Sequence, residues 1–197
     1  MTVFKSSLLA LALLAANPLV AQAESTFVTG TGKLSAAAKL DFSVTIPQIL
    51  LLQVGAVGAV DKIVFDMTGV ASAVGNNVAV SGTGGDQAGG KVTARLLGNV
   101  GNVTLSSTTT GPLSNGAGDT ISYSQINATS SNGFAPPALA DAATTGITVN
   151  ATGKIIDQSA QWTFKYANAA VVAPGVYGGG GTGNTGNGRV TYTASMP

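Results

Sequence analysis

The amino-acid sequence predicts an all-β fold, most simply an antiparallel β-sandwich. Apolar and polar side chains alternate in several short stretches, which is the pattern of half-buried strands. Turns rich in glycine and asparagine separate these stretches. No stretch after the first 23 residues has a convincing helical period. Roughly nine short strands with such turns suit a sandwich, with a β-barrel as the structural alternative.

The first 23 residues have the order of parts of a secretory signal peptide. Lys5 supplies a basic start, residues 8–16 are an apolar run, and residues 21–23 read Ala-Gln-Ala. We therefore predict cleavage after Ala23 and export of the remaining chain. An N-terminal membrane anchor is the alternative, but the apolar run is shorter than the roughly 20 residues that a spanning helix needs. No later apolar run reaches that length.

The exported chain carries little charge. Without Lys5, eight basic residues balance eight acidic ones. No basic patch is visible, so nucleic acid is not an expected partner. Charged residues make up 9% of the sequence, against about a quarter in ordinary domains. Near-neutral surfaces tend to associate, which suits a subunit that packs against its own copies. The chain has no cysteine, so its stability must come from its core and its sheets.

The first predicted strand is unusually long. Every second residue from Leu34 to Ile46 is apolar, and Pro47 follows and cannot donate to a sheet. Later predicted strands cover residues 49–54, 62–66, 78–80, 91–97, 103–107, 120–126, 147–151, 160–166 and 189–196.

Several of these strands predict which side chains face inward. The continuous apolar run at 49–54 suits a strand that is buried on both faces or that crosses between sheets. We expect inward faces from Val92, Ala94 and Leu96, from Ile121 and Tyr123, and from Val190, Tyr192, Ala194 and Met196. Trp162, Phe164 and Tyr166 also share a face; we favour a core role for them over a sugar-binding platform.

Catalytic chemistry has little support in this sequence. The chain has no histidine or cysteine, which excludes the usual nucleophilic triads and most transition-metal sites. Among the carboxylates, Asp61 and Asp66 flank a short predicted strand and Asp119 and Asp141 lie in predicted loops, and no spacing singles out a glycosidase pair. Residues 81–90 faintly resemble a calcium-binding glycine repeat, but Asp86 is their only carboxylate, so we favour a turn. We expect no enzyme, cofactor or metal.

Two segments carry a resemblance to a known group of proteins. Residues 42–53 (FSVTIPQILLLQ) resemble the N-terminal strands of the major subunits of alpha-type colonisation-factor fimbriae. Residues 174–178 and 189–193 resemble the ending of many bacterial pilin-like domains, with a long glycine-rich insertion between them. The resemblance implies an Ig-like sandwich, export through the periplasm to the bacterial surface, and assembly by strand exchange. Implied partners are copies of the chain or related subunits, a periplasmic chaperone and an outer-membrane usher.

Strand exchange needs an extended donor with alternating apolar side chains. We expect residues 24–38 to be that donor, with Leu34, Ala36 and Ala38 entering a neighbour's groove. Residues 39–46 would then begin the sandwich domain, which would cover 39–197. A single long, bent strand within one sandwich is the open alternative for residues 34–46.

The C-terminal hairpin containing Tyr177 and Tyr192 could line the assembly groove, although we favour a structural role for both rings. The favoured function is a structural subunit of a surface fibre that also supports adhesion. A monomeric, secreted lectin-like or adhesin domain is the alternative.

Overall fold

The computed structural model describes residues 26–179 and 186–197. The predicted signal peptide lies outside these residues. The chain divides into two compact units, the first ending at Ile46 and the second covering Pro47–Pro197. Each unit is considered by itself below.

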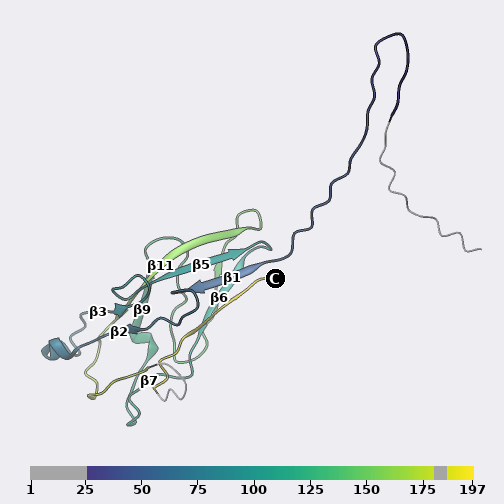
Figure 1. Ribbon diagram of the computed structural model, residues 1–197. Coiled ribbons are helices and arrows are strands. Elements are labelled where there is room, and N and C mark those ends of the chain that lie inside the picture. Colours follow the sequence, from purple (N-terminus) through teal and green to yellow (C-terminus); the bar gives the residue numbers. More distant parts are fainter. Residues whose placement is uncertain (1–25, 180–185) are drawn as a thin grey trace, which may run out of the picture. The chain divides into compact units, whose positions relative to one another are not determined.

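The second unit confirms the all-β prediction (Figure 1). Its described strands are β1 (Leu50–Val54), β2 (Ile63–Val64), β3 (Val80–Ser81), β4 (Thr83–Gly84), β5 (Lys91–Gly98), β6 (Val103–Thr108), β7 (Leu113–Ser114), β8 (Thr120–Ile121), β9 (Ile126–Ser130), β10 (Ile147–Val149), β11 (Ile156–Tyr166) and β12 (Thr191–Ser195). Two short 3-10 helices are η1 (Thr68–Ala73) and η2 (Tyr123–Gln125).

Two antiparallel sheets form the sandwich. The large sheet has the order β1-β5-β11-β3, and β9 pairs with β11 on its other edge. Figure 1 shows β1, β5 and β11 side by side in that order. The small sheet has the order β10-β6-β12. There are also two two-stranded pairs, β2 with β4 and β7 with β8. The sheets among these residues stay open and do not close into a barrel.

The core lies between the two sheets and follows the alternation of the sequence. β5 and β11 bury alternate side chains, and β6 buries Val103 and Leu105 from the opposite sheet. The predicted inward residues of β5 (Val92, Ala94 and Leu96) and of β11 (Trp162, Phe164 and Tyr166) are all buried. The aromatic face of β11 is therefore core, as expected, because it packs under the small sheet instead of facing solvent.

The start of the domain differs from the prediction. Residues 39–46 form no strand, and the second unit begins at Pro47. Alternating apolar residues indicate a segment that suits a pleated, half-buried surface. A strand also needs a neighbouring strand that forms hydrogen bonds with its main-chain groups. The strand predicted at 49–54 does form, as β1, but Leu50 and Leu51 are 39% and 45% exposed. It is an edge strand, not one buried on both faces.

The stretch predicted as one strand at 120–126 is divided. β8 ends at Ile121, and the Ser122 side chain accepts a hydrogen bond from the Ser124 main chain, which begins η2. This local serine cap competes with the sheet for the main-chain donors. Tyr123 is buried as predicted, and Ile121 is half-buried.

Candidate assembly site

One edge of the large sheet is unpaired. β1 pairs with β5 on one side and with no described strand on the other. The Gly55 main-chain N–H donates to the Thr93 carbonyl at 2.7 Å, and the β1–β5 register continues from this pair. In an antiparallel ladder, alternate residues bond to the partner strand. Main-chain groups of Leu50, Leu52 and Val54 therefore point to the free edge.

β12, an edge strand of the small sheet, likewise has no described partner strand on one side. Tyr192 of β12 lies opposite Ser107 of β6. The Ser107 N–H donates to the Thr144 hydroxyl at 3.1 Å, and its carbonyl accepts from the Thr144 N–H at 2.9 Å. Because both Ser107 groups turn away from β12, Tyr192 and Ala194 direct their main-chain groups outward.

These two free edges lie next to each other over the core, and together they are called the open side below. Cα atoms of β1 and β12 approach within 8 Å. The Tyr192 ring lies 5.3 Å from the Trp162 ring, and burial raises the pKa of the Tyr192 phenol. The inward side chains of both strands pack on the core but stay only half-buried: Leu52, Val54, Tyr192, Ala194 and Met196.

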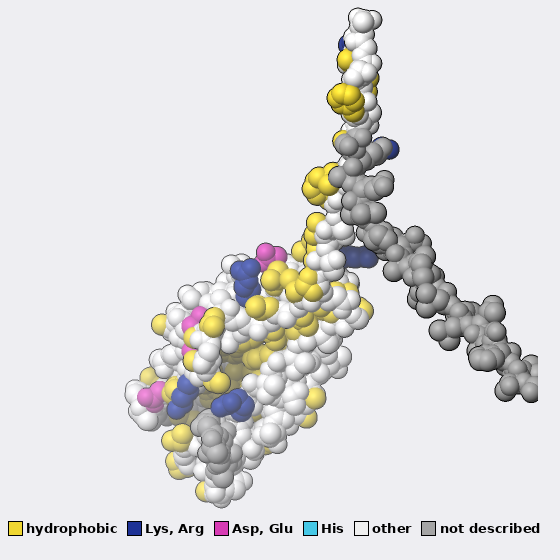
Figure 2. All heavy atoms as spheres, turned by 45° about the vertical axis from the view of Figure 1, so that its right-hand side comes forward, with side chains coloured by type: hydrophobic (Ala, Val, Ile, Leu, Met, Phe, Trp, Pro, Cys, Tyr) yellow, Lys and Arg dark blue, Asp and Glu magenta, His cyan; other side chains and the backbone are white. Residues whose placement is uncertain are grey.

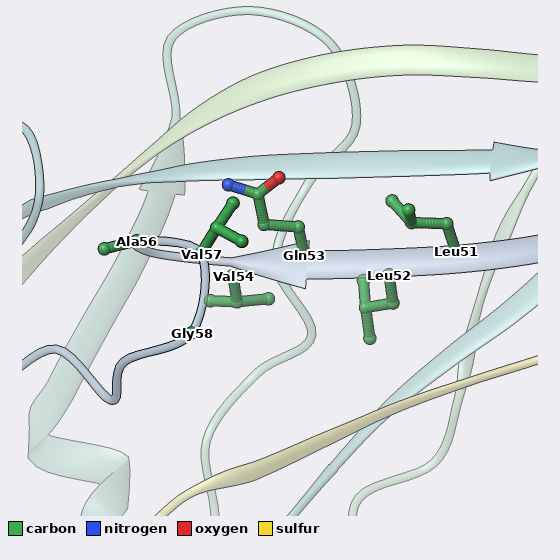
Figure 3. A pocket seen from close by; sticks show the side chains of 7 residues that line it. All are labelled: Leu51, Leu52, Gln53, Val54, Ala56, Val57 and Gly58. Carbon is green, nitrogen blue, oxygen red and sulfur yellow. The ribbon is translucent and has the colours of Figure 1, made fainter.

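A shallow pocket follows β1 along the open side (Figure 3). Leu52 and Val54 lie on one side of the strand, and Leu51 and Gln53 lie on the other. The loop after the strand adds Ala56, Val57 and Gly58 to the lining. The pocket thus offers an apolar surface beside unpaired main-chain groups.

The opposite side of the sandwich is closed. Residues 131–146, called the closing segment below, connect β9 with β10, the other edge strands of the two sheets. Phe134, Pro137 and Leu139 of this segment are buried. The Trp162 indole N–H donates to the Phe134 carbonyl at 3.0 Å, and the Ser107 hydroxyl donates to the Ala138 carbonyl at 3.0 Å.

The N-terminal segment, residues 26–46, exposes its apolar side chains. Leu40 and Ile46 are each 76% exposed, Phe42 is 86% and Val44 is 83%. Figure 2 shows hydrophobic side chains along this segment. All four are even-numbered, so an extended backbone places them on one face. Within the segment, the Thr26 hydroxyl donates to the Ala37 carbonyl at 2.9 Å, so residues 26–38 fold back on themselves.

The candidate donor residues Leu34, Ala36 and Ala38 are exposed and lie in this folded-back part.

The two candidate residues of the C-terminal hairpin lie in different parts of the domain. Tyr192 belongs to β12 on the open side, whereas Tyr177 lies in a loop and its hydroxyl donates to the Ala173 carbonyl at 2.7 Å. The Gly178 N–H donates to the Ser114 carbonyl of β7, so this loop pairs with a different strand. Sequence reasoning predicted the strand at 49–54 but not that this strand, β1, ends the large sheet and forms half of the open side.

Four of the five candidate carboxylates serve local turns, and Asp141 instead joins the closing segment to η2. Asp86 accepts from the Thr93 N–H at 2.8 Å, which closes the glycine-rich turn that follows β4. Each of the other four candidates accepts a hydrogen bond from a nearby group: Asp61 from Ala56, Asp66 from Thr68, Asp119 from Asn115 and Asp141 from Tyr123. In the described part of the chain no three acidic residues gather to hold a metal ion.

Fold and site together define a β-sandwich that is closed on one side and open on the other. Comparisons with protein-family models, curated proteins and solved structures give no match. Within residues 26–179 and 186–197, neither helix is long and apolar enough to cross a membrane.

Proposed function

We propose that this chain is an exported structural subunit of a bacterial surface fibre, in which copies join by β-strand exchange. One observation carries the proposal: a single chain holds both an apolar open side and an exposed segment of alternating apolar residues. A β-strand added to a free edge gains main-chain hydrogen bonds, and its alternate side chains fill pockets. We include a non-enzymatic role, passage through the periplasm, and help from a chaperone and an usher in the same proposal.

The dimensions of the two parts agree. Residues 40–46 would span about 23 Å as a strand, at about 3.3 Å per residue. β1 and β12 each have five residues, or about 17 Å. The segment is therefore long enough to run along the full length of either edge strand with its four apolar side chains.

Burial energy favours residues 40–46 over residues 34–38 as the donor. Burying a side chain such as leucine or phenylalanine stabilises by about 1.5–3 kcal/mol, and alanine contributes much less. Leu40, Phe42, Val44 and Ile46 would therefore bind more tightly than Leu34, Ala36 and Ala38. In this assignment Leu34, Ala36 and Ala38 lengthen the donor strand but contribute little to its binding energy.

Electron microscopy and size exclusion of the native protein sheared from cells test the proposal. We expect thin filaments or a ladder of multimers from the wild type. Phe42→Asp should reduce assembly at least about a hundredfold, because a buried carboxylate costs several kcal/mol. Ser43→Asp, on the opposite face of the same segment, is the matched control and should still assemble.

The fluorescence of Trp162, the single tryptophan, reports whether each variant is folded. A folded wild-type protein that elutes only as a monomer would contradict the fibre proposal. It would favour the alternative, a monomeric ligand-binding or adhesin domain.

A further inference from the structure

The Asn99 side chain bridges the link that precedes β1. Its amide N–H donates to the Pro47 carbonyl at 2.9 Å, and its amide oxygen accepts from the Ile49 N–H at 2.9 Å. Leu50 lies opposite Gly98, so continuing the register places Ile49 opposite Asn99. The amide therefore supplies the pair of bonds that a further step of the ladder would make, and it holds Pro47 to Ile49 in line with β1.

This link is short enough to form a turn. Three residues, Pro47 to Ile49, separate Ile46 from Leu50, and three-residue loops are common in β-hairpins. A turn there would pair the chain's own N-terminal segment with the free edge of β1. Ile46 would then lie opposite Leu50 and Val44 opposite Leu52.

Such a hairpin would suit the open side of the same molecule. Leu50, Leu52 and Val54 are the residues whose main-chain groups reach the free edge, and even-numbered donors would bond to them directly. Phe42 would lie opposite Val54, so its ring would face inward with Val54 and Leu52. A subunit whose own segment paired with β1 would have no free β1 edge for a neighbour.

We propose that the Asn99 bridge keeps the link extended, so that the open side accepts residues 40–46 of a second copy and not the chain's own segment. Forming the hairpin turns Pro47 out of line with β1 and so breaks the bond between the Asn99 amide N–H and the Pro47 carbonyl. The bridge thus selects assembly between copies over closure within one copy. This inference rests on the proposed function.

An engineered disulfide distinguishes the two arrangements. In the hairpin Ser43 lies opposite Gln53 in a non-hydrogen-bonded pair, where Cβ atoms come close enough for a disulfide. The chain has no cysteine, so Ser43→Cys with Gln53→Cys introduces the only two thiols. Copies labelled with ¹⁴N and ¹⁵N are mixed before assembly. Mass spectrometry then separates bonds within one copy from bonds between copies.

Asn99→Ala in this background should raise the ratio of disulfides within one copy to those between copies by about tenfold, because two hydrogen bonds to the link are lost. Filaments should shorten correspondingly. Asn99→Asp keeps the acceptor for Ile49 but loses the donor to Pro47, and it should give an intermediate ratio. Asn102→Ala is the control, since Asn102 lies in the same turn but accepts from Ala151.

The possible outcomes separate the two proposals. An unchanged ratio in folded Asn99→Ala, with normal filaments, overturns the role of the bridge and leaves the fibre proposal intact. A wild-type protein without filaments or bonds between copies overturns both. If Asn99→Ala does not fold, by Trp162 fluorescence, Asn99→Asp decides: a ratio equal to that of the wild type overturns the inference.

Discussion

The two long sides of the sandwich are built from similar edge strands but are completed differently. On the closed side, residues 131–146 supply buried side chains and main-chain acceptors to both sheets. On the open side, β1 and β12 end the sheets with half-buried apolar side chains and unpaired main-chain groups. Exposed apolar edges tend to pair with other chains unless something covers them. Under the proposed function, the open side is the one that a partner chain would cover.

Removing an apolar side chain from each side gives the largest expected contrast. Phe134→Ala on the closed side should lower the free energy of unfolding by about 3–5 kcal/mol, because the ring packs edge-on against Trp162 at 5.5 Å. Leu50→Ala on the open side should lower it by less than about 1 kcal/mol, because that side chain is already partly exposed. Urea unfolding of the monomer, followed by Trp162 fluorescence, measures both.

Equal losses for Phe134→Ala and Leu50→Ala would mean that the two sides are equally covered in solution, and the comparison would fail. Filaments sharpen the comparison further. In filaments Leu50→Ala should lower the free energy of unfolding by more than in the monomer, because a neighbour's strand would bury the side chain.

The polar attachment of the closing segment gives a smaller effect. Ser107→Ala removes a hydroxyl that bonds to the Ala138 carbonyl and contacts the Thr144 hydroxyl at 3.0 Å. We expect a loss of about 1–3 kcal/mol, because these buried groups lose a partner. Ser106→Ala, one residue earlier and less buried, is the matched control and should change stability by less than about 0.5 kcal/mol. Comparable losses for the two would contradict a special role for Ser107.

Much of the sandwich was predictable because its central strands have a neighbouring strand on each edge and one face buried in the core. β5 and β11 bury the side chains that their alternation indicates. The closing segment was not predicted, since its sequence around Phe134, Pro137 and Leu139 has no period and is held by long-range hydrogen bonds. Residues 39–46 have the alternating pattern of a strand but form none, because the pattern does not indicate whether a partner strand is present.

The candidate site was predicted less well than the fold. The alternating N-terminal segment and Tyr192 were found from sequence, but Tyr177 lies elsewhere. The role of β1 depends on strand order, which the apolar run at 49–54 does not reveal. Asn99 follows Gly98 in an ordinary turn sequence, and only the three-dimensional register brings its amide to Pro47.

Alkaline pH gives the third test, because the pKa values of two tyrosines are raised: Tyr123, which the closing segment contacts through Asp141, and Tyr192 of β12. Burial and the nearby Asp141 of the closing segment raise the pKa of Tyr123 to about 12, above the usual value of about 10. Below pH 10 this phenol is protonated whether the chain is folded or unfolded, so its contribution to stability is fully present. Between pH 10 and 12 the unfolded chain loses the proton first, so stability falls as the pH rises.

Tyr123→Phe should therefore reduce the slope of stability between pH 10 and 12. It should also lower stability at neutral pH, because the Tyr123 hydroxyl donates to the Asn187 carbonyl at 2.6 Å. Burial and the neighbouring Tyr123 phenol raise the pKa of Tyr192, so adding Tyr192→Phe to Tyr123→Phe should reduce the slope further. Urea midpoints at pH 9, 10, 11 and 12 measure each slope, and a slope in Tyr123→Phe equal to that of the wild type would contradict the assignment.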